Sequence, residues 1–213
     1  MQLLLISGRE HDIYGNALTS MHRLRHKVFI QKLKWPKSRK GPIHAVSGME
    51  FDDFDVEEAY YIVHLHESGV VDGCLRMLPT TQPYLLGECY PNLIDGEVPC
   101  AVDVWEVSRF AADTSLAPDN ILALLLCGMI EFGLALSLRS IISVSDIRIE
   151  RLIDKAGLKR ERLGSTLFTG TDTAAAERYE VSVDAHRALQ KYIKVKESVL
   201  KRTEILDSNK MAA

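Results

Sequence analysis

Three short segments place charged residues inside runs that otherwise have the character of buried strands. Residues 50–55 (EFDDFD) alternate acids with aromatic residues. Arg76 lies within an apolar run, and Glu106 and Arg109 lie within another. Arginine and glutamate are rarely fully buried unless they are paired with an opposite charge. The pattern therefore predicts one shared network of three arginines and three acids: Arg25, Arg76 and Arg109 with Asp52, Asp55 and Glu106.

Each segment alone has a simpler explanation. A lone arginine in a strand is usually half-exposed, or it pairs across strands for under about 1 kcal/mol. An acidic loop is usually a solvated turn. The occurrence of all three segments in one chain, with Phe29 and Trp35 upstream, favours a functional site.

The spacing of Glu106 and Arg109 raises a geometric difficulty. Residues three apart in a regular strand point to opposite faces of the sheet. Either a bulge turns one of them to the other face, or Arg109 works on the opposite side. Both arrangements are compatible with the sequence.

The elements that position these residues follow from periodicity and turn residues. Apolar residues recur at helical spacing over 15–34, so Arg25 and Phe29 share a helix face, and Trp35-Pro36 ends that helix. The segment 36–50 is a Gly/Pro/Lys-rich loop. Strands 60–66 and 70–78 form a hairpin across Glu67-Ser68-Gly69.

The remaining expected elements alternate between helix and strand. We predict strands at 2–6, 102–111, 140–145, near Leu167 and at 178–183, with an irregular stretch at 79–102. Helices are predicted at 119–138, at 146–156, where Gly157 ends the helix, and at 184–200. Residues 203–213 are expected to be a frayed tail. This order predicts an α/β fold, a single αβα sandwich domain around one mixed sheet over residues 1–213.

Composition excludes several classes of protein. The net charge of the 213 residues is −3, which does not point to nucleic acid. The four cysteines form no C-x-x-C pair, so we expect no metal site. The longest apolar run, 121–138, is interrupted by Glu131 and suits a core helix better than a membrane span. The N-terminus lacks the pattern of a signal peptide, so a cytoplasmic protein is expected.

Eight positions in order resemble the acyl-homoserine lactone synthases, which make autoinducers for quorum sensing. The matching residues are Arg25, Phe29, Trp35, Asp52, Asp55, Arg76, Glu106 and Arg109. The resemblance implies a fold like the GNAT acyltransferases, in which splayed central strands hold the pantetheine arm. The Gly-rich phosphate loop of ordinary acetyltransferases is not visible after Phe110, which argues against an acetyl-CoA-dependent acetyltransferase.

The resemblance also implies the reaction. The amine of S-adenosylmethionine (SAM) attacks an acyl thioester carried by acyl carrier protein or coenzyme A, and lactonisation then releases methylthioadenosine. Both reactants are substrates, so no further cofactor is expected. Glu106 is the candidate general base, directly or through a water. The residues expected to bind SAM are Phe29, Trp35, Arg25 and Asp52, with Asp55, Arg76 and Arg109 completing the catalytic set. Whether the arginines pair with the SAM carboxylate or with the acids is left open.

The second half of the chain carries the weaker expectations. The resemblance implies an acyl pocket formed by Leu126, Met129, Ser143, Ser145, Ile149 and Leu152, although each could equally belong to an ordinary core. Members that use 3-oxo chains often have threonine at the position of Ser143, so serine leaves that preference open. A basic face for an acidic carrier protein is the alternative to a solvated helix face for Arg148, Arg151, Lys155 and Lys159.

Two other functions remain possible at this point. One is a GNAT-type N-acyltransferase that acts on a different amine. The other is a non-catalytic ligand-binding domain of the same fold, which would tolerate loss of Glu106.

Overall fold

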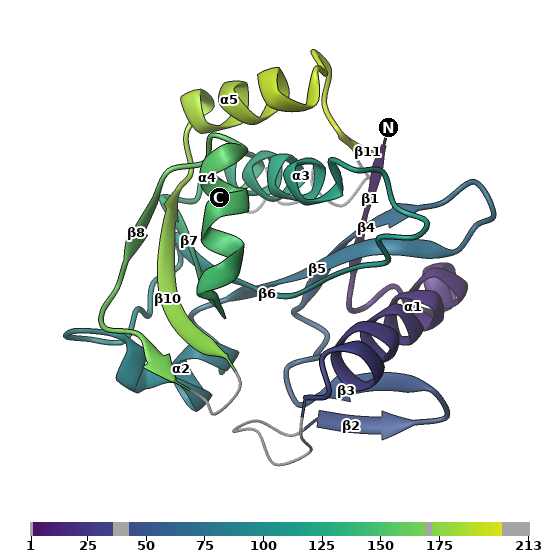
Figure 1. Cartoon of the computed structure of the whole chain (residues 1–213), viewed down its shortest axis with the longest axis horizontal. Helices are drawn as coiled ribbons and strands as arrows, with labels where there is room; N and C mark the ends of the chain where they lie inside the picture. The colour runs from purple at the N-terminus through teal and green to yellow at the C-terminus, as the bar shows by residue number, and fades with distance from the viewer. Residues whose placement is uncertain (1, 36–42, 169–171, 202–213) are drawn as a thin grey trace.

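A computed structural model describes residues 2–35, 43–168 and 172–201 (Figure 1). One mixed sheet dominates this part of the chain. Its strands are β1 (Leu3–Ser7), β4 (Tyr60–Leu65), β5 (Val71–Pro79), β6 (Val104–Ala112), β7 (Ser140–Asp146), β8 (Arg160–Arg162), β9 (Leu167–Phe168), β10 (Thr173–Glu180) and β11 (Leu200–Lys201). They are ordered β11-β1-β4-β5-β6-β7-β10-β8, and β9 pairs with β10. The β6–β7 and β1–β11 pairs are parallel, and the other pairs are antiparallel.

Helices cover both faces of the sheet (Figure 1). One face carries α1 (His11–Arg25), which continues into a π-helical segment (His26–Lys32), together with α2 (Leu85–Cys89) and the hairpin of β2 (Ile43–Val46) and β3 (Met49–Asp52). The other face carries α3 (Ile121–Ala135), α4 (Glu150–Lys155) and α5 (Val183–Ile193). The predicted αβα sandwich is confirmed.

Each face of the sheet has its own apolar core. Leu124, Leu125 and Phe132 of α3 are wholly buried against one face, because this helix is apolar on nearly every side. Leu18 and Met21 of α1 pack on the other face. Among the described helices, none combines the length and apolarity that crossing a membrane requires.

The central strands β6 and β7 separate partway along their length. Their pairing runs from Val104 opposite Ser140 to Val107 opposite Ser143, although both strands continue beyond it. The expected splay is therefore present. It opens the sheet at the point where the charged residues of β6 lie.

A bulge in β6 resolves the difficulty over Glu106 and Arg109. Opposite β5, Arg76 pairs with Ser108 and Cys74 pairs with Ala111, so β6 has one extra residue between these pairs. Arg109 has a left-handed backbone, with φ of 53°, which is uncommon outside glycine. Both charged side chains consequently face the α1 and α2 side of the sheet, where their partners lie.

Several element predictions were wrong in extent. The stretch 79–102 is not wholly irregular, because α2 forms within it, and the loop at 36–50 contains β2 and the start of β3. The last helix ends at Ile193, since Lys194 adopts a left-handed conformation with φ of 59°. Strand β10 begins at Thr173, earlier than expected. The predicted tail at 203–213 and part of the loop, 36–42, lie outside the described residues.

Candidate active site

Three arginines and three acids form a closed ring of ion pairs on the α1 side of the sheet. In order around the ring they are Arg25, Glu50, Arg109, Asp52, Arg76 and Asp55. The Glu50 carboxylate joins two of them, at 2.5 Å from Arg25 Nε and 3.0 Å from Arg109 Nε. Charges alternate around the ring and balance within it.

The ring is buried, and two of its arginines keep the Asp55 carboxylate ionised. Arg25, Arg76 and Glu50 have no exposed surface. Burial alone would raise the pKa of Asp55, but Arg25 and Arg76 hold it well below its usual range. Its oxygens accept from Arg25 at 2.7 and 2.8 Å and from Arg76 at 2.9 Å. The question left open by the sequence is thus answered for this structure: the arginines pair with the acids.

Glu106 does not belong to this ring, so the predicted network was wrong in one member. Glu50 takes the place expected for Glu106. The Glu106 carboxylate instead accepts the backbone N–H groups of Leu85 at 3.1 Å and Leu86 at 2.6 Å, at the start of α2. These donors could not be predicted from the sequence, because a helix of five residues has no clear periodicity.

The surroundings of Glu106 adjust its proton affinity. The side chain is fully buried, and burial raises its pKa to about 7, against the opposing effect of the two N–H donors and of Arg76 and Arg109. A carboxylate with this pKa can accept a proton at neutral pH and release it again.

Two aromatic rings lie beside the ring of charges. Phe29 and Trp35 stack with centroids 4.5 Å apart and planes inclined by 14°. The Arg109 guanidinium lies 5.7 Å from the Phe29 centroid and 5.9 Å from that of Trp35. Such rings attract a cation through their π faces. The π-helical segment carries Phe29 toward this position.

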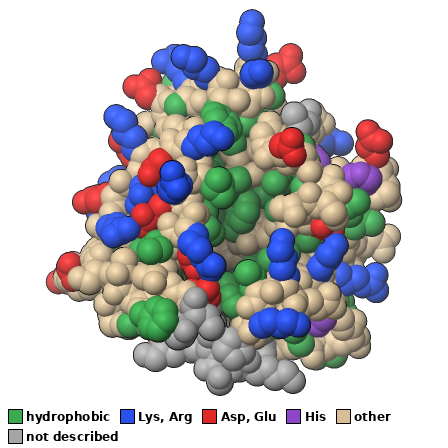
Figure 2. Space-filling model, viewed as in Figure 1, with side chains coloured by type: hydrophobic (Ala, Val, Ile, Leu, Met, Phe, Trp, Pro, Cys, Tyr) green, Lys and Arg blue, Asp and Glu red, His purple; other side chains and the backbone are tan. Residues whose placement is uncertain are grey.

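A cavity of about 360 Å³ joins these residues to the opposite face of the sheet through the β6–β7 splay. On one side it is lined by Phe29, Trp35, Asp52 and Arg109. Figure 2 shows a hollow in the surface of the molecule, lined by hydrophobic side chains and surrounded by charged ones. One continuous space thus connects a charged and aromatic half with an apolar half.

A sequence model of the family described as "Autoinducer synthase" matches residues 9–189 of the chain. The chain belongs to the autoinducer synthase family. An acyl-homoserine-lactone synthase from Acinetobacter baumannii is 34% identical over 174 residues, a match that spans 77% of this chain and 92% of the relative.

Solved structures of autoinducer synthases share the fold. The crystal structure of the synthase LasI has a TM-score of 0.76 and 30% identity, with 95% of this chain and 98% of that chain covered. BjaI, a CoA-dependent acyl-homoserine lactone synthase solved with SAM and isopentyl-CoA, has a TM-score of 0.85 at 21% identity, with 99% of both chains covered. The expected fold, family and acyltransferase class are confirmed.

The apolar half of the cavity in this autoinducer synthase contains four of the six residues expected there. The structure places them on its wall: Leu126, Ser143, Ser145 and Ile149. Met129 is wholly buried in the core and does not line the cavity, and Leu152 is 54% exposed on the outer side of α4. The helical phase explains this correction, since Ile149 and Ile153 are four apart and turn inward together.

Residues that sequence reasoning missed complete the wall. Leu122 lies one helical turn before Leu126, and Tyr179 reaches the cavity from β10. The i, i+4 spacing of Leu122 could have indicated it. Tyr179 could not be found this way, because its approach depends on the pairing of β10 with β7.

The expected basic face is exposed but partly neutralised. Arg151, Lys155 and Lys159 are exposed. Arg148, whose side chain is 70% exposed, lies at the cavity wall and forms ion pairs with Asp146 at 2.7 Å and Asp172 at 2.6 Å.

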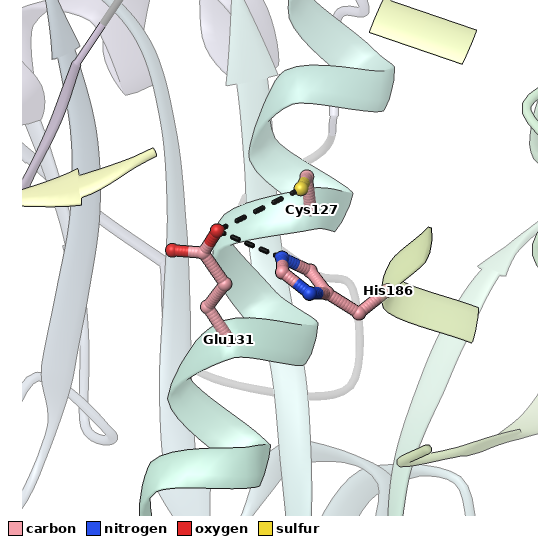
Figure 3. Close-up of side chains that lie close together, drawn as sticks. All are labelled: Cys127, Glu131 and His186. Atoms are coloured by element: carbon pink, nitrogen blue, oxygen red, sulfur yellow. Dashed lines mark hydrogen bonds and ion pairs between the residues drawn. The ribbon is translucent and has the colours of Figure 1, made fainter. Parts of the chain in front are cut away.

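A separate cluster joins α3 and α5 away from the cavity. Cys127, Glu131 and His186 offer ligand atoms within 4.8 Å of one another (Figure 3). The Glu131 carboxylate, however, already accepts from His186 and from the backbone N–H groups of Val199 and Leu200. Burial and Glu131 raise the pKa of the Cys127 thiol to about 12, so it stays protonated. These contacts fasten the C-terminal segment to α3.

Proposed function

We propose that this enzyme acylates the α-amine of SAM from an acyl thioester and then closes the lactone, releasing methylthioadenosine. The observation that carries the proposal is the continuous cavity through the splay of β6 and β7, because two substrates of different chemistry must meet in one space. The aromatic and charged half suits SAM, and the apolar half suits an acyl chain.

Glu106 is the proposed general base. An α-amine has a pKa of about 7.7–8.0, so a carboxylate with a pKa of about 7 is well matched to take its proton. Glu106 is fully buried and does not itself line the cavity, whereas its neighbour Val107 does. We therefore propose that the proton reaches Glu106 through a water and not directly.

Phe29 and Trp35 are the proposed sulfonium and adenine contacts. The Arg109 guanidinium lies 5.7 and 5.9 Å from their centroids, which supports a role in binding a cation. Asp52 lies on the cavity wall and is the acid of the ring that can reach SAM. We assign Arg25, Arg76 and Asp55 a positioning role, because their charged groups are occupied within the ring.

Ring closure needs little beyond geometry. The SAM carboxylate attacks the carbon bonded to its own sulfonium, which is a good leaving group. Holding reacting atoms in a near-attack arrangement can supply about 7–11 kcal/mol of a barrier. The part of the cavity that is lined by Phe29, Trp35 and Arg109 is the proposed place for the curled substrate.

The donor is proposed to be an acyl thioester of acyl carrier protein or of coenzyme A. Exposed Arg151, Lys155 and Lys159 support carrier-protein docking, since the carrier is acidic. Arg148 contributes less charge, because two aspartates pair with it.

The test is product analysis by mass spectrometry. The protein is incubated with SAM and a panel of acyl-CoA and acyl-carrier-protein donors, and acyl-homoserine lactone and methylthioadenosine are expected in equal amounts. Replacing SAM with methionine, which lacks the sulfonium, is the matched control. Formation of acyl-methionine, with no lactone formed from SAM, would favour a different N-acyltransferase. No acylated product with any donor would favour a binding domain.

A further inference from the structure

A polar strip interrupts the otherwise apolar half of the cavity. Ser143 and Ser145 are two apart in β7, so their side chains share one face of the strand. Both line the cavity, as does Tyr179 from the neighbouring strand β10. Glu177, which pairs with Ser143 across the two strands, lies behind them and has no exposed surface.

The Glu177 carboxylate fixes the direction of the hydrogen bonds in this strip. An ionised carboxylate only accepts. Arg160 Nη1 donates to Oε1 at 2.9 Å, and the Tyr179 hydroxyl donates to Oε2 at 2.7 Å. Ser145 Oγ also donates to Oε2, at 3.3 Å. Burial raises the pKa of the Glu177 carboxyl, whereas the Arg160 guanidinium lowers it. The ion pair with Arg160 at 2.9 Å favours the ionised form, in which Tyr179 and Ser145 both donate their protons to the carboxylate.

The direction of the Tyr179 hydrogen bond also decides which group donates in the contact between Tyr179 and Ser143. Its Oγ lies 3.2 Å from the Tyr179 hydroxyl oxygen. Because the single phenol proton is directed to Glu177, Ser143 must be the donor in this contact. The Ser143 oxygen then has only lone pairs to offer the cavity. The same holds for Ser145.

The strip therefore accepts hydrogen bonds from a ligand and donates none. We propose that the preferred acyl group carries a hydroxyl group opposite Ser143 rather than a keto group, an inference that rests on the proposed function. A hydroxyl can donate to the Ser143 oxygen without disturbing the relay. A keto oxygen can only accept, so it would be buried without a partner or would force Ser143 to turn away from Tyr179.

The expected discrimination follows from one hydrogen bond. A net hydrogen bond in a protein corresponds to roughly a tenfold change in an equilibrium or rate ratio. We expect kcat/KM for a hydroxyacyl donor to exceed that for the matched ketoacyl donor by about tenfold. An unsubstituted chain of the same length should fall between them, because it neither donates nor leaves an acceptor unpaired.

The experiment compares three donors of equal chain length, with a hydroxyl group, a keto group or no substituent at the same carbon, and repeats the comparison at successive carbons. Lactone formation from SAM is followed for each. Tyr179→Phe should free the Ser143 proton for the cavity, so the ratio of hydroxyacyl to ketoacyl turnover should fall toward one. Ser143→Ala should abolish the preference. Ile149→Val is the matched control at an apolar wall position and should leave the ratio unchanged while altering the rates.

The outcomes separate this inference from the proposed function. A wild-type preference for the keto donor at every carbon, or equal use of both, would overturn the inference while lactone formation still supports the function. An unchanged ratio in Tyr179→Phe would overturn the relay. No lactone from any of the donors would overturn the proposed function, and the inference with it.

Discussion

Replacing Glu50 with glutamine removes the acid that joins Arg25 to Arg109. The side chain has no exposed surface, and both arginines lie within hydrogen-bonding distance of its oxygens. Glutamine keeps the shape but leaves the ring with three positive and two negative charges. Breaking a buried ion pair by removing one partner costs about 3–5 kcal/mol, because the remaining charge is uncompensated. We expect the free energy of unfolding to fall by about 3 kcal/mol, since the amide oxygen keeps one hydrogen bond.

Urea denaturation at neutral pH measures this loss as a lower midpoint with an unchanged slope. Glu58→Gln is the matched control, because Glu58 pairs with Arg9 at 3.1 Å where both side chains are largely exposed. Its cost should not exceed about 1 kcal/mol. The double variant Arg25→Gln/Glu50→Gln restores charge balance, so its cost should be less than the sum of the single changes. Equal costs for Glu50→Gln and Glu58→Gln would refute the idea of a charge-balanced ring.

Three other predictions concern separate parts of the molecule. Glu131→Gln should lower the unfolding free energy by about 1–3 kcal/mol in urea, because the N–H groups of the C-terminal segment lose their carboxylate. Trp35→Leu should raise the KM for SAM by roughly 3- to 30-fold without a similar rise for the acyl donor, because a cation–π contact is lost. Arg151→Glu/Lys155→Glu should raise the KM for acyl-carrier-protein donors and leave the KM for acyl-CoA unaffected, because the proposed docking brings only the carrier protein to that face.

Each of these has a clear contrary result. Glu197 is exposed in the same C-terminal segment, so a Glu197→Gln loss as large as that of Glu131→Gln would remove the fastening role. Equal increases in both KM values for Trp35→Leu would indicate general damage instead of lost SAM binding. Identical effects on both donor types would show that the basic face does not contact a carrier protein.

The charged residues of the site were predictable from sequence, but their pairing was not. Arg76 and Glu106 stand out because charges are rare in buried strands. Which acid meets which arginine depends on the bulge at Arg109, where a left-handed residue turns the side chain to the other face. No residue type signals that conformation here, since glycine is absent from the position. Glu50 was therefore passed over in favour of Glu106.

The apolar half of the cavity shows which of its residues could be identified from the sequence and which could not. Ile149 was named from the family resemblance, and the structure places it on the cavity wall. Leu152 was misplaced because the helix phase was not taken from its buried partner Ile153. The hydrogen-bond relay through Tyr179 and Glu177 needs the register of two antiparallel strands, which only the folded sheet provides.

In the proposed reaction, Glu106 accepts the proton of the attacking amine. The direct measurement is the rate of amide formation against pH, in single turnovers, for the wild type and Glu106→Gln. A base works only when deprotonated, so the wild-type rate should rise with pH and level off above a midpoint near 7. Glu106→Gln should fold normally, and its rate of amide formation should be roughly 10²–10⁴-fold lower. The transition near pH 7 should be absent from its pH profile. A Glu106→Gln rate close to that of the wild type, with the same pH dependence, would exclude Glu106 as the general base.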